Sequence, residues 1–225
     1  MNSPFKFSPS RLVRLAAGSL WLRLASLLAL ATFTVFRGGA GFWLPLTDFL
    51  GSAALLLLWI PLVSRLLIGQ PVLSTDPRRT LLTRLYPWLI AYEGALWLLF
   101  SLLPAVSDTF PEVNPVAAAV QVTVTGTGVA VSFLIYLLSL RQMANPADSV
   151  GRAHLGDLMN LAAALAAASV VLNVIPLSGM PAPTLGDKVA YGLVNAAEAA
   201  SWLLLRWALV TGSPEEAPSD QPSNT

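Results

Sequence analysis

Residues 113–140 read VNPVAAAVQVTVTGTGVAVSFLIYLLSL, which is 28 residues without one charged side chain. A membrane-spanning helix needs about 20 mostly apolar residues. Residues 158–186 form a second charge-free stretch of similar length. In the whole chain only 11% of the residues are Asp, Glu, Lys or Arg, compared with roughly 25% in soluble proteins. The sequence therefore predicts an all-α, polytopic membrane helix bundle.

Four further apolar stretches bring the prediction to six transmembrane helices. One of them contains no charged residue, and each of the other three contains one or two charged residues inside an apolar run. The predicted spans are 16–36, 49–64, 85–105, 113–140, 158–186 and 189–211. A capping side chain followed by proline is typical of helix N-termini. Such pairs occur at Ser8-Pro9, Asp76-Pro77, Asn114-Pro115 and Asn145-Pro146.

The positions of Lys and Arg predict the orientation of the bundle, because cytoplasmic loops carry an excess of these residues. With six spans, most of the basic residues outside the spans fall on the side of the two termini. We therefore expect a cytoplasmic segment over 1–15, a transmembrane domain over 16–211 and a disordered cytoplasmic tail over 212–225. A bacterial cytoplasmic membrane fits this pattern, and a thylakoid or other internal membrane stays open. The first span also resembles a cleaved signal peptide, but Arg23 interrupts its apolar region.

Composition also excludes several classes of function. The net charge is +1 and no basic run is present, so no nucleic-acid partner is expected. The chain has no cysteine and a single histidine, which argues against thiol chemistry, haem and metal sites. We expect no cofactor and no bound metal. No catalytic motif is visible, so an intramembrane enzyme ranks behind non-enzymatic functions.

Two of the predicted spans match each other at an offset of 105 residues. Residues 86–99 (YPWLIAYEGALWLL) align without gaps on 191–204 (YGLVNAAEAASWLL), and seven of the fourteen positions are identical. The rare residue types Tyr, Glu and Trp coincide at three of them. Because each unit would hold three spans, the second unit enters the membrane from the opposite side. The sequence thus predicts a 3+3 inverted-topology repeat, with units over about 16–105 and 116–211.

The matched residues form a stripe on each helix, since positions 7 and 11 residues after the tyrosine return to within about 20° of it. The stripes are Tyr86, Glu93 and Trp97 in the first unit, and Tyr191, Glu198 and Trp202 in the second. Alanines on the opposite faces have the small-x-x-x-small spacing that lets membrane helices pack closely. These predicted packing residues are Ala91, Ala95, Ala196 and Ala200. If the alanine faces pack against helices, the glutamate faces are left to line a cavity or an interface.

The glutamates suggest two classes of function. A carboxyl group inside a membrane costs about 2.5 kcal/mol or more, so two at matched positions call for a role. In the leading hypothesis the protein is a small transporter or permease, with the six stripe residues and Asn195 as binding or transport candidates. In the alternative it is a non-catalytic membrane subunit or assembly factor that binds other helices, lipids or pigments. Both leave room for a homo-oligomer or a larger membrane complex in the bilayer, and a cavity at the glutamates would favour transport.

Two glycines inside the longest apolar stretch allow two local structures. Gly126 and Gly128 alternate with threonines, which could mark an unwound helix whose carbonyl groups line a cavity. A straight helix, with threonines bonded to carbonyl groups one turn earlier, is the favoured interpretation.

Overall fold

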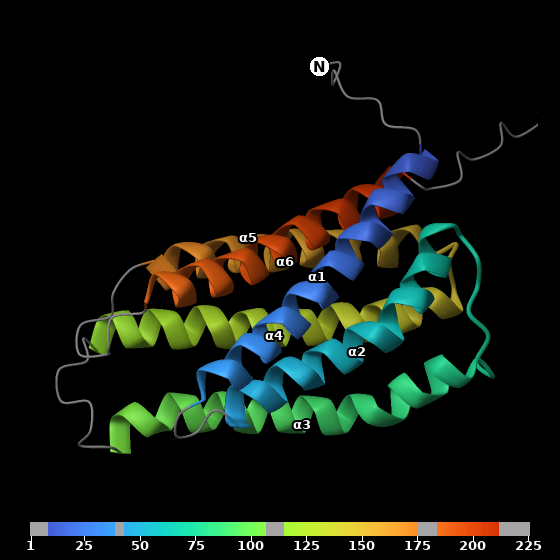
Figure 1. Ribbon diagram of the computed structural model, residues 1–225. Coiled ribbons are helices and arrows are strands. Elements are labelled where there is room, and N and C mark those ends of the chain that lie inside the picture. The colour runs from blue at the N-terminus through green and yellow to red at the C-terminus, as the bar shows by residue number, and fades with distance from the viewer. Residues whose placement is uncertain (1–8, 39–42, 107–114, 175–183, 212–225) are drawn as a thin grey trace, which may run out of the picture.

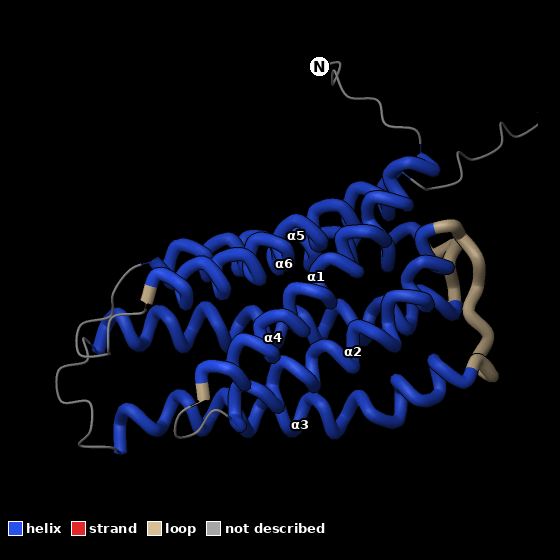
Figure 2. The backbone as a smooth tube through the Cα atoms, in the orientation of Figure 1, coloured by secondary structure: helices blue, strands red, loops and turns tan. Residues whose placement is uncertain are grey.

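The computed structural model of the protein describes residues 9–38, 43–106, 115–174 and 184–211. These residues form six helices and, within those ranges, no strand (Figure 2). The helices are α1 (Pro9–Arg37), α2 (Trp43–Leu67), α3 (Pro77–Val106), α4 (Pro115–Ala144), α5 (Ser149–Val174) and α6 (Leu185–Thr211). The all-α prediction is confirmed for this part of the chain. The predicted disordered tail over 212–225 lies outside the described residues.

The contacts between the helices follow the order of the sequence and close into a ring, with an additional contact between α2 and α4. Each helix packs against the next one along the chain, and α6 packs against α1 to close the ring. The contacts between α5 and α6 are the most extensive, and those between α3 and α4 are the sparsest in the ring. Such a ring encloses a central space that every helix can reach.

Five helices, namely α1, α2, α4, α5 and α6, are long and apolar enough to cross a membrane. Large apolar side chains also cover the outside of the bundle, among them Phe36 (86% exposed) and Trp88 (76% exposed). Water would make such a surface costly, whereas lipid tails are as apolar as the side chains themselves. The fold is therefore compatible with a multi-pass membrane protein. α3 has 30 residues but is not among the five, so the count of six spans stays a prediction.

Helix ends explain where the predicted boundaries hold and where they fail. Helices α1, α3 and α4 begin at the predicted prolines, and Asp76 accepts a hydrogen bond from the backbone N–H of Arg78 at 2.9 Å. The fourth predicted start, at Asn145-Pro146, is wrong. Helix α5 instead begins at Ser149, because the Asp148 carboxylate accepts a hydrogen bond from the Gly151 N–H at 3.0 Å. Helix α5 is described as far as Val174, and residue 186, the predicted end of that span, belongs to α6.

Helix α4 runs without a break from Pro115 to Ala144, through both glycines of the Thr-Gly-Thr-Gly sequence. The prediction of an unbroken helix is therefore confirmed, and the hydrogen bonds of the threonines stay a prediction. The start of α1 and the end of α6 lie at one end of the bundle, which is the arrangement that an even number of spans produces (Figure 1).

The ring does not confirm the predicted inverted repeat. Rotation by 180° about an axis in the membrane plane changes a clockwise order of helices, viewed from one side, into an anticlockwise order. The predicted repeat places α1 on α4, α2 on α5 and α3 on α6, which keeps the clockwise order. One such rotation therefore cannot superpose all three pairs of helices in this ring. The match between 86–99 and 191–204 stays a prediction about two helices, α3 and α6.

Candidate binding cavity

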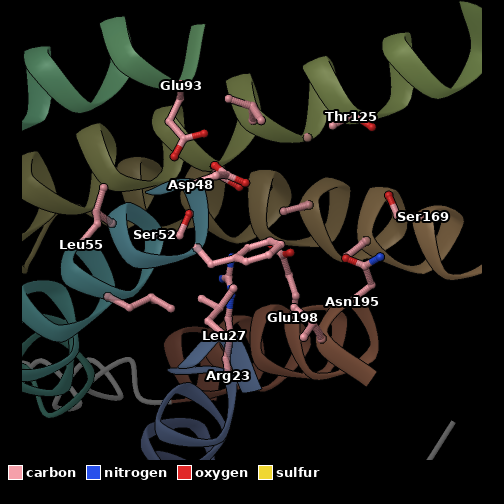
Figure 3. A pocket seen from close by; sticks show the side chains of 18 of the residues that line it. Arg23, Leu27, Asp48, Ser52, Leu55, Glu93, Thr125, Ser169, Asn195 and Glu198 are labelled. Carbon is pink, nitrogen blue, oxygen red and sulfur yellow. The ribbon is translucent and has the colours of Figure 1, made fainter. Parts of the chain in front are cut away.

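A cavity of about 270 Å³ lies inside the ring, and all six helices contribute to its wall. Figure 3 shows acidic and basic side chains pointing toward one another across it. The polar and aromatic residues of the wall are Arg23, Asp48, Phe49, Ser52, Glu93, Thr125, Ser132, Phe133, Tyr136, Ser169, Tyr191, Asn195 and Glu198. Aliphatic side chains and small residues complete the wall. Charged groups are thus gathered at the centre of a bundle whose outside is apolar.

An ion pair joins α1 to α6 at one wall of the cavity. The Arg23 guanidinium donates a hydrogen bond to the Glu198 carboxylate, and the side chains are 10% and 23% exposed. Trp202 supports both partners. Its indole Nε1–H donates to Glu198 Oε1 at 3.1 Å, and its ring lies 4.7 Å from the guanidinium carbon of Arg23. The Glu198 carboxylate thus accepts hydrogen bonds from both the guanidinium and the indole, and the indole ring also attracts the guanidinium charge.

A second acidic centre lies on α2 and α3. The side chains of Asp48 and Glu93 both line the cavity and lie next to each other in its wall (Figure 3). Two neighbouring carboxylates repel each other strongly in a site that excludes water, so the pair is stable when it holds one proton. Asp48 belongs to the second turn of α2, because this helix begins at Trp43, six residues before the predicted span. The two glutamates of the predicted repeat therefore have different partners, an arginine for Glu198 and a carboxyl group for Glu93.

An aromatic cluster packs beneath the ion pair. The ring of Trp59 lies 4.9 Å from that of Tyr136 and 5.9 Å from that of Trp202, both edge to face. Trp59 is fully buried and donates its indole N–H to the Ser139 hydroxyl at 2.8 Å. Edge-to-face contacts of this kind each contribute about 1 kcal/mol beyond the area that they bury. The cluster ties α2, α4 and α6 together and fixes the position of Trp202 under Arg23.

A further ion pair lies at the end of the bundle where α1 ends and α6 begins. Arg37 donates to the buried carboxylate of Asp187, which also accepts from the Thr184 backbone N–H at 2.9 Å and hydroxyl at 2.8 Å. The Asp187 N–H in turn bonds to the Thr184 hydroxyl at 3.2 Å. This reciprocal pattern is that of a capping box with Asp in place of Glu. It starts α6 and holds α1 against α6 at a second point.

The stripe residues do not all reach the cavity. Glu93, Tyr191, Asn195 and Glu198 line it. Trp202 is buried behind the wall and acts on it through Arg23 and Glu198. Tyr86 instead donates its hydroxyl to the carbonyl oxygen of Phe133, across the contact between α3 and α4. The side chain of Trp97 lies outside the described residues.

The predicted alanine packing is not found between helices of this chain. Ala91, Ala95, Ala196 and Ala200 are all exposed. The glutamates on the opposite faces point inward, so the alanines point away from the ring. Their close packing against a helix stays a prediction for a partner helix or a second copy in the membrane.

Sequence reasoning missed Arg23 and Asp48 as members of the site. In the sequence, Arg23 interrupts the apolar region of the first predicted span, and Asp48 directly precedes the second predicted span at 49–64. A charge inside an apolar span is itself a signal, because such residues face the bundle interior and pair with one another. Pairing of the Arg23 span with the Glu198 span could have been inferred from opposite charge at mid-helix.

The described residues include no group of three or more His, Asp or Glu side chains that could hold a metal ion. Comparison of the chain with known protein families, with curated proteins and with solved structures finds no match. The function is therefore argued from the geometry of the cavity.

Proposed function

We propose that this protein is a small membrane transporter or permease, and that the central cavity is its substrate site. The observation that carries the proposal is a cavity lined from all six helices with acids on facing walls. Glu93 and Glu198 both belong to it, as the transport hypothesis requires. Tyr191 and Asn195 add an aromatic ring and an amide next to Glu198.

The free-energy cost of burying charged side chains supports this proposal over a purely structural role. A buried ion pair is often no more stabilising than apolar residues of similar volume, because desolvation offsets the attraction. A scaffold built only for stability would therefore gain little from Arg23, Asp48, Glu93 and Glu198 around a cavity. Intramembrane ionisable residues that face an internal space are typical of substrate and ion pathways.

The alternative function is a membrane subunit or assembly factor that binds helices, lipids or pigments. Its support is on the outside of the bundle, where Val116, Ala119, Val120, Thr123 and Val124 line a shallow apolar groove on α4. The exposed alanine faces of α3 and α6 fit the same alternative. A subunit of this kind needs no route from the cavity to water, and this difference separates the two functions.

Cysteine accessibility tests the transport proposal without knowledge of the substrate. The chain has no native cysteine, so Ser52→Cys and Ser169→Cys place single thiols in the cavity wall. We expect an impermeant thiosulfonate reagent to label both from each side of the membrane, in right-side-out and in inverted vesicles. Ala167→Cys, an exposed position on α5 that faces lipid, is the matched control and should react at least about tenfold more slowly, because a thiol in lipid does not ionise. Cavity thiols that resist the reagent from both sides would refute transport.

The orientation of the bundle is a separate prediction. Loops rich in Arg should be cytoplasmic, which places Ser74 between α2 and α3 inside and residue Phe110 outside. On intact cells an impermeant thiol reagent is expected to label Phe110→Cys and to spare Ser74→Cys until the cells are opened. The reverse labelling pattern would show that both termini are outside.

A further inference from the structure

The charges of the cavity are not balanced. Its wall holds three acids and one base, and the base is already committed to Glu198. The remaining acids, Asp48 and Glu93, lie next to each other in the wall (Figure 3), and two neighbouring carboxyl groups in a site that excludes water hold one proton between them. Together they carry a single negative charge, so the cavity as a whole is anionic. An anionic cavity inside an apolar bundle attracts a cation and repels an anion.

The other titratable groups around this carboxyl pair leave its charge unopposed. They are Arg23 on α1, Tyr136 on α4, and Tyr191 and Glu198 on α6, whereas α5 contributes none to the wall. Arg23 and Glu198 cancel each other, and both tyrosines are neutral as phenols. No second base on the described wall competes with a bound cation.

Size and wall chemistry favour an organic cation over a bare metal ion. A volume of about 270 Å³ corresponds to roughly nine water molecules at ~30 Å³ each. The described residues provide no group of three metal-ligating side chains. Aromatic rings are present instead, with Phe49 and Tyr191 only 6.3 Å apart. Aromatic faces beside carboxylates are the surroundings in which ammonium groups bind.

Arg23 adds a feature that points to a hydrogen-bond acceptor on the ligand. Its side chain is nine-tenths buried and lines the cavity, and its Nη1 has no hydrogen-bond partner among the described residues. A buried guanidinium N–H without a partner is costly. An acceptor oxygen on a molecule in the cavity would satisfy it.

We infer that the ligand is a small organic ammonium compound with an acceptor oxygen, bound at Asp48 and Glu93 in exchange for the proton that they share. This inference rests on the proposed transport function. When the cation binds, both carboxyl groups are ionised and one proton leaves to the water on the side to which the cavity is open. The charge in the cavity is the same before and after, so cation and proton exchange one for one.

Choline tests this inference, because it is a permanently charged ammonium compound with a hydroxyl group and does not cross lipid as a free base. Proteoliposomes are loaded with the pH dye pyranine at equal internal and external pH, and choline chloride is added outside. The interior is expected to become alkaline at least about tenfold faster than in liposomes without protein. Tetramethylammonium, which lacks the hydroxyl, should be slower than choline, and equal rates would refute the role of Arg23.

Two variants test whether Glu93 and Asp48 release the proton that exchanges for choline. Glu93→Gln and Asp48→Asn replace an acid that can release the shared proton by an amide that cannot, so each should abolish the choline-driven pH change. Asp157→Asn on α5 alters an exposed acid outside the cavity wall and should behave as the unmodified protein does. Monodisperse elution of each variant in detergent shows that loss of exchange is not loss of folding. Full exchange in either cavity variant would overturn the inference.

The remaining outcomes separate this inference from the proposed function. If sodium chloride changes the internal pH and choline does not, the ligand is an inorganic cation and the inference is wrong. If no cation changes it while the Ser52→Cys and Ser169→Cys thiols react from both sides, transport stands and the cation assignment falls. If those thiols react from neither side, the transport proposal itself has failed.

Discussion

Glu198→Gln is expected to lower the midpoint of thermal unfolding in detergent by about 5 to 10 °C, whereas Glu93→Gln should change it by less than ~2 °C. Glu198 is the counter-ion of Arg23, whose side chain is only 10% exposed. An amide keeps the hydrogen bonds but leaves the guanidinium charge unpaired, and removal of one partner of a buried pair costs about 3 kcal/mol. Glu93 lies next to a second carboxyl group, that of Asp48, so a neutral amide there removes repulsion and suits its surroundings.

A double variant provides the control for this prediction. In Arg23→Met with Glu198→Met both charges are gone and the apolar side chains have similar volumes. Because desolvation of the pair is also removed, most of the lost stability should return. Equal destabilisation by Glu198→Gln and Glu93→Gln, or a double variant less stable than Glu198→Gln, would contradict the assignment of the ion pair.

This prediction departs from what the sequence alone indicates. The matched Tyr-Glu-Trp stripes suggest that the two glutamates are equivalent and that glutamine should suit both positions. In the structure they differ, because α6 packs against α1 and thereby meets Arg23. Position in a repeat fixes which way a side chain points along its own helix. It does not fix which neighbour that side chain meets.

The helices themselves were predictable because their signals are local. Apolar runs set the position of most spans, and the prolines at residues 9, 77 and 115 mark helix starts within one residue. The failures occur where a charged residue lies near a helix end. The predicted second span omits residues 43–48, whereas α2 includes them and Asp48 faces the polar cavity rather than lipid. The start of α5 was misplaced because Asp148 competes with Asn145 as the capping residue.

The cavity could be predicted only in part, since its assembly depends on contacts between distant segments. The inward direction of Glu93 and Glu198 follows from the helical spacing of each stripe. The Arg23 and Glu198 pair joins residues 175 positions apart, and the order of helices around the ring decides it. Loop lengths and hydropathy do not determine that order. One consequence is that the aromatic support of the ion pair, which involves Trp59 and Tyr136, has no signal in the sequence.

The second large predicted effect is a loss of stability when Trp202 is removed from the aromatic cluster. Trp202→Ala is expected to destabilise the protein by about 3 kcal/mol, which is the lower end of the range for buried Trp to Ala changes. The lower end applies because lipid is as apolar as the core, so the loss is mainly one of packing contacts. Trp202 is fully buried and touches the rings of Trp59 and Tyr136, at 5.9 and 6.4 Å between centroids. The thermal midpoint in detergent measures the effect.

Two further tryptophan variants separate the contributions of Trp202. Trp207→Ala changes a 48% exposed residue on the lipid-facing side of the same helix, and its effect should stay below ~1 kcal/mol because it leaves no cavity behind. Trp202→Phe keeps most of the buried ring but removes the N–H that bonds to Glu198 at 3.1 Å and weakens the attraction to Arg23. It should therefore cost about 1 to 2 kcal/mol. If Trp202→Phe instead matches the unmodified protein while Trp202→Ala does not, the tryptophan only fills space, and Arg23 and Glu198 hold their positions without its help.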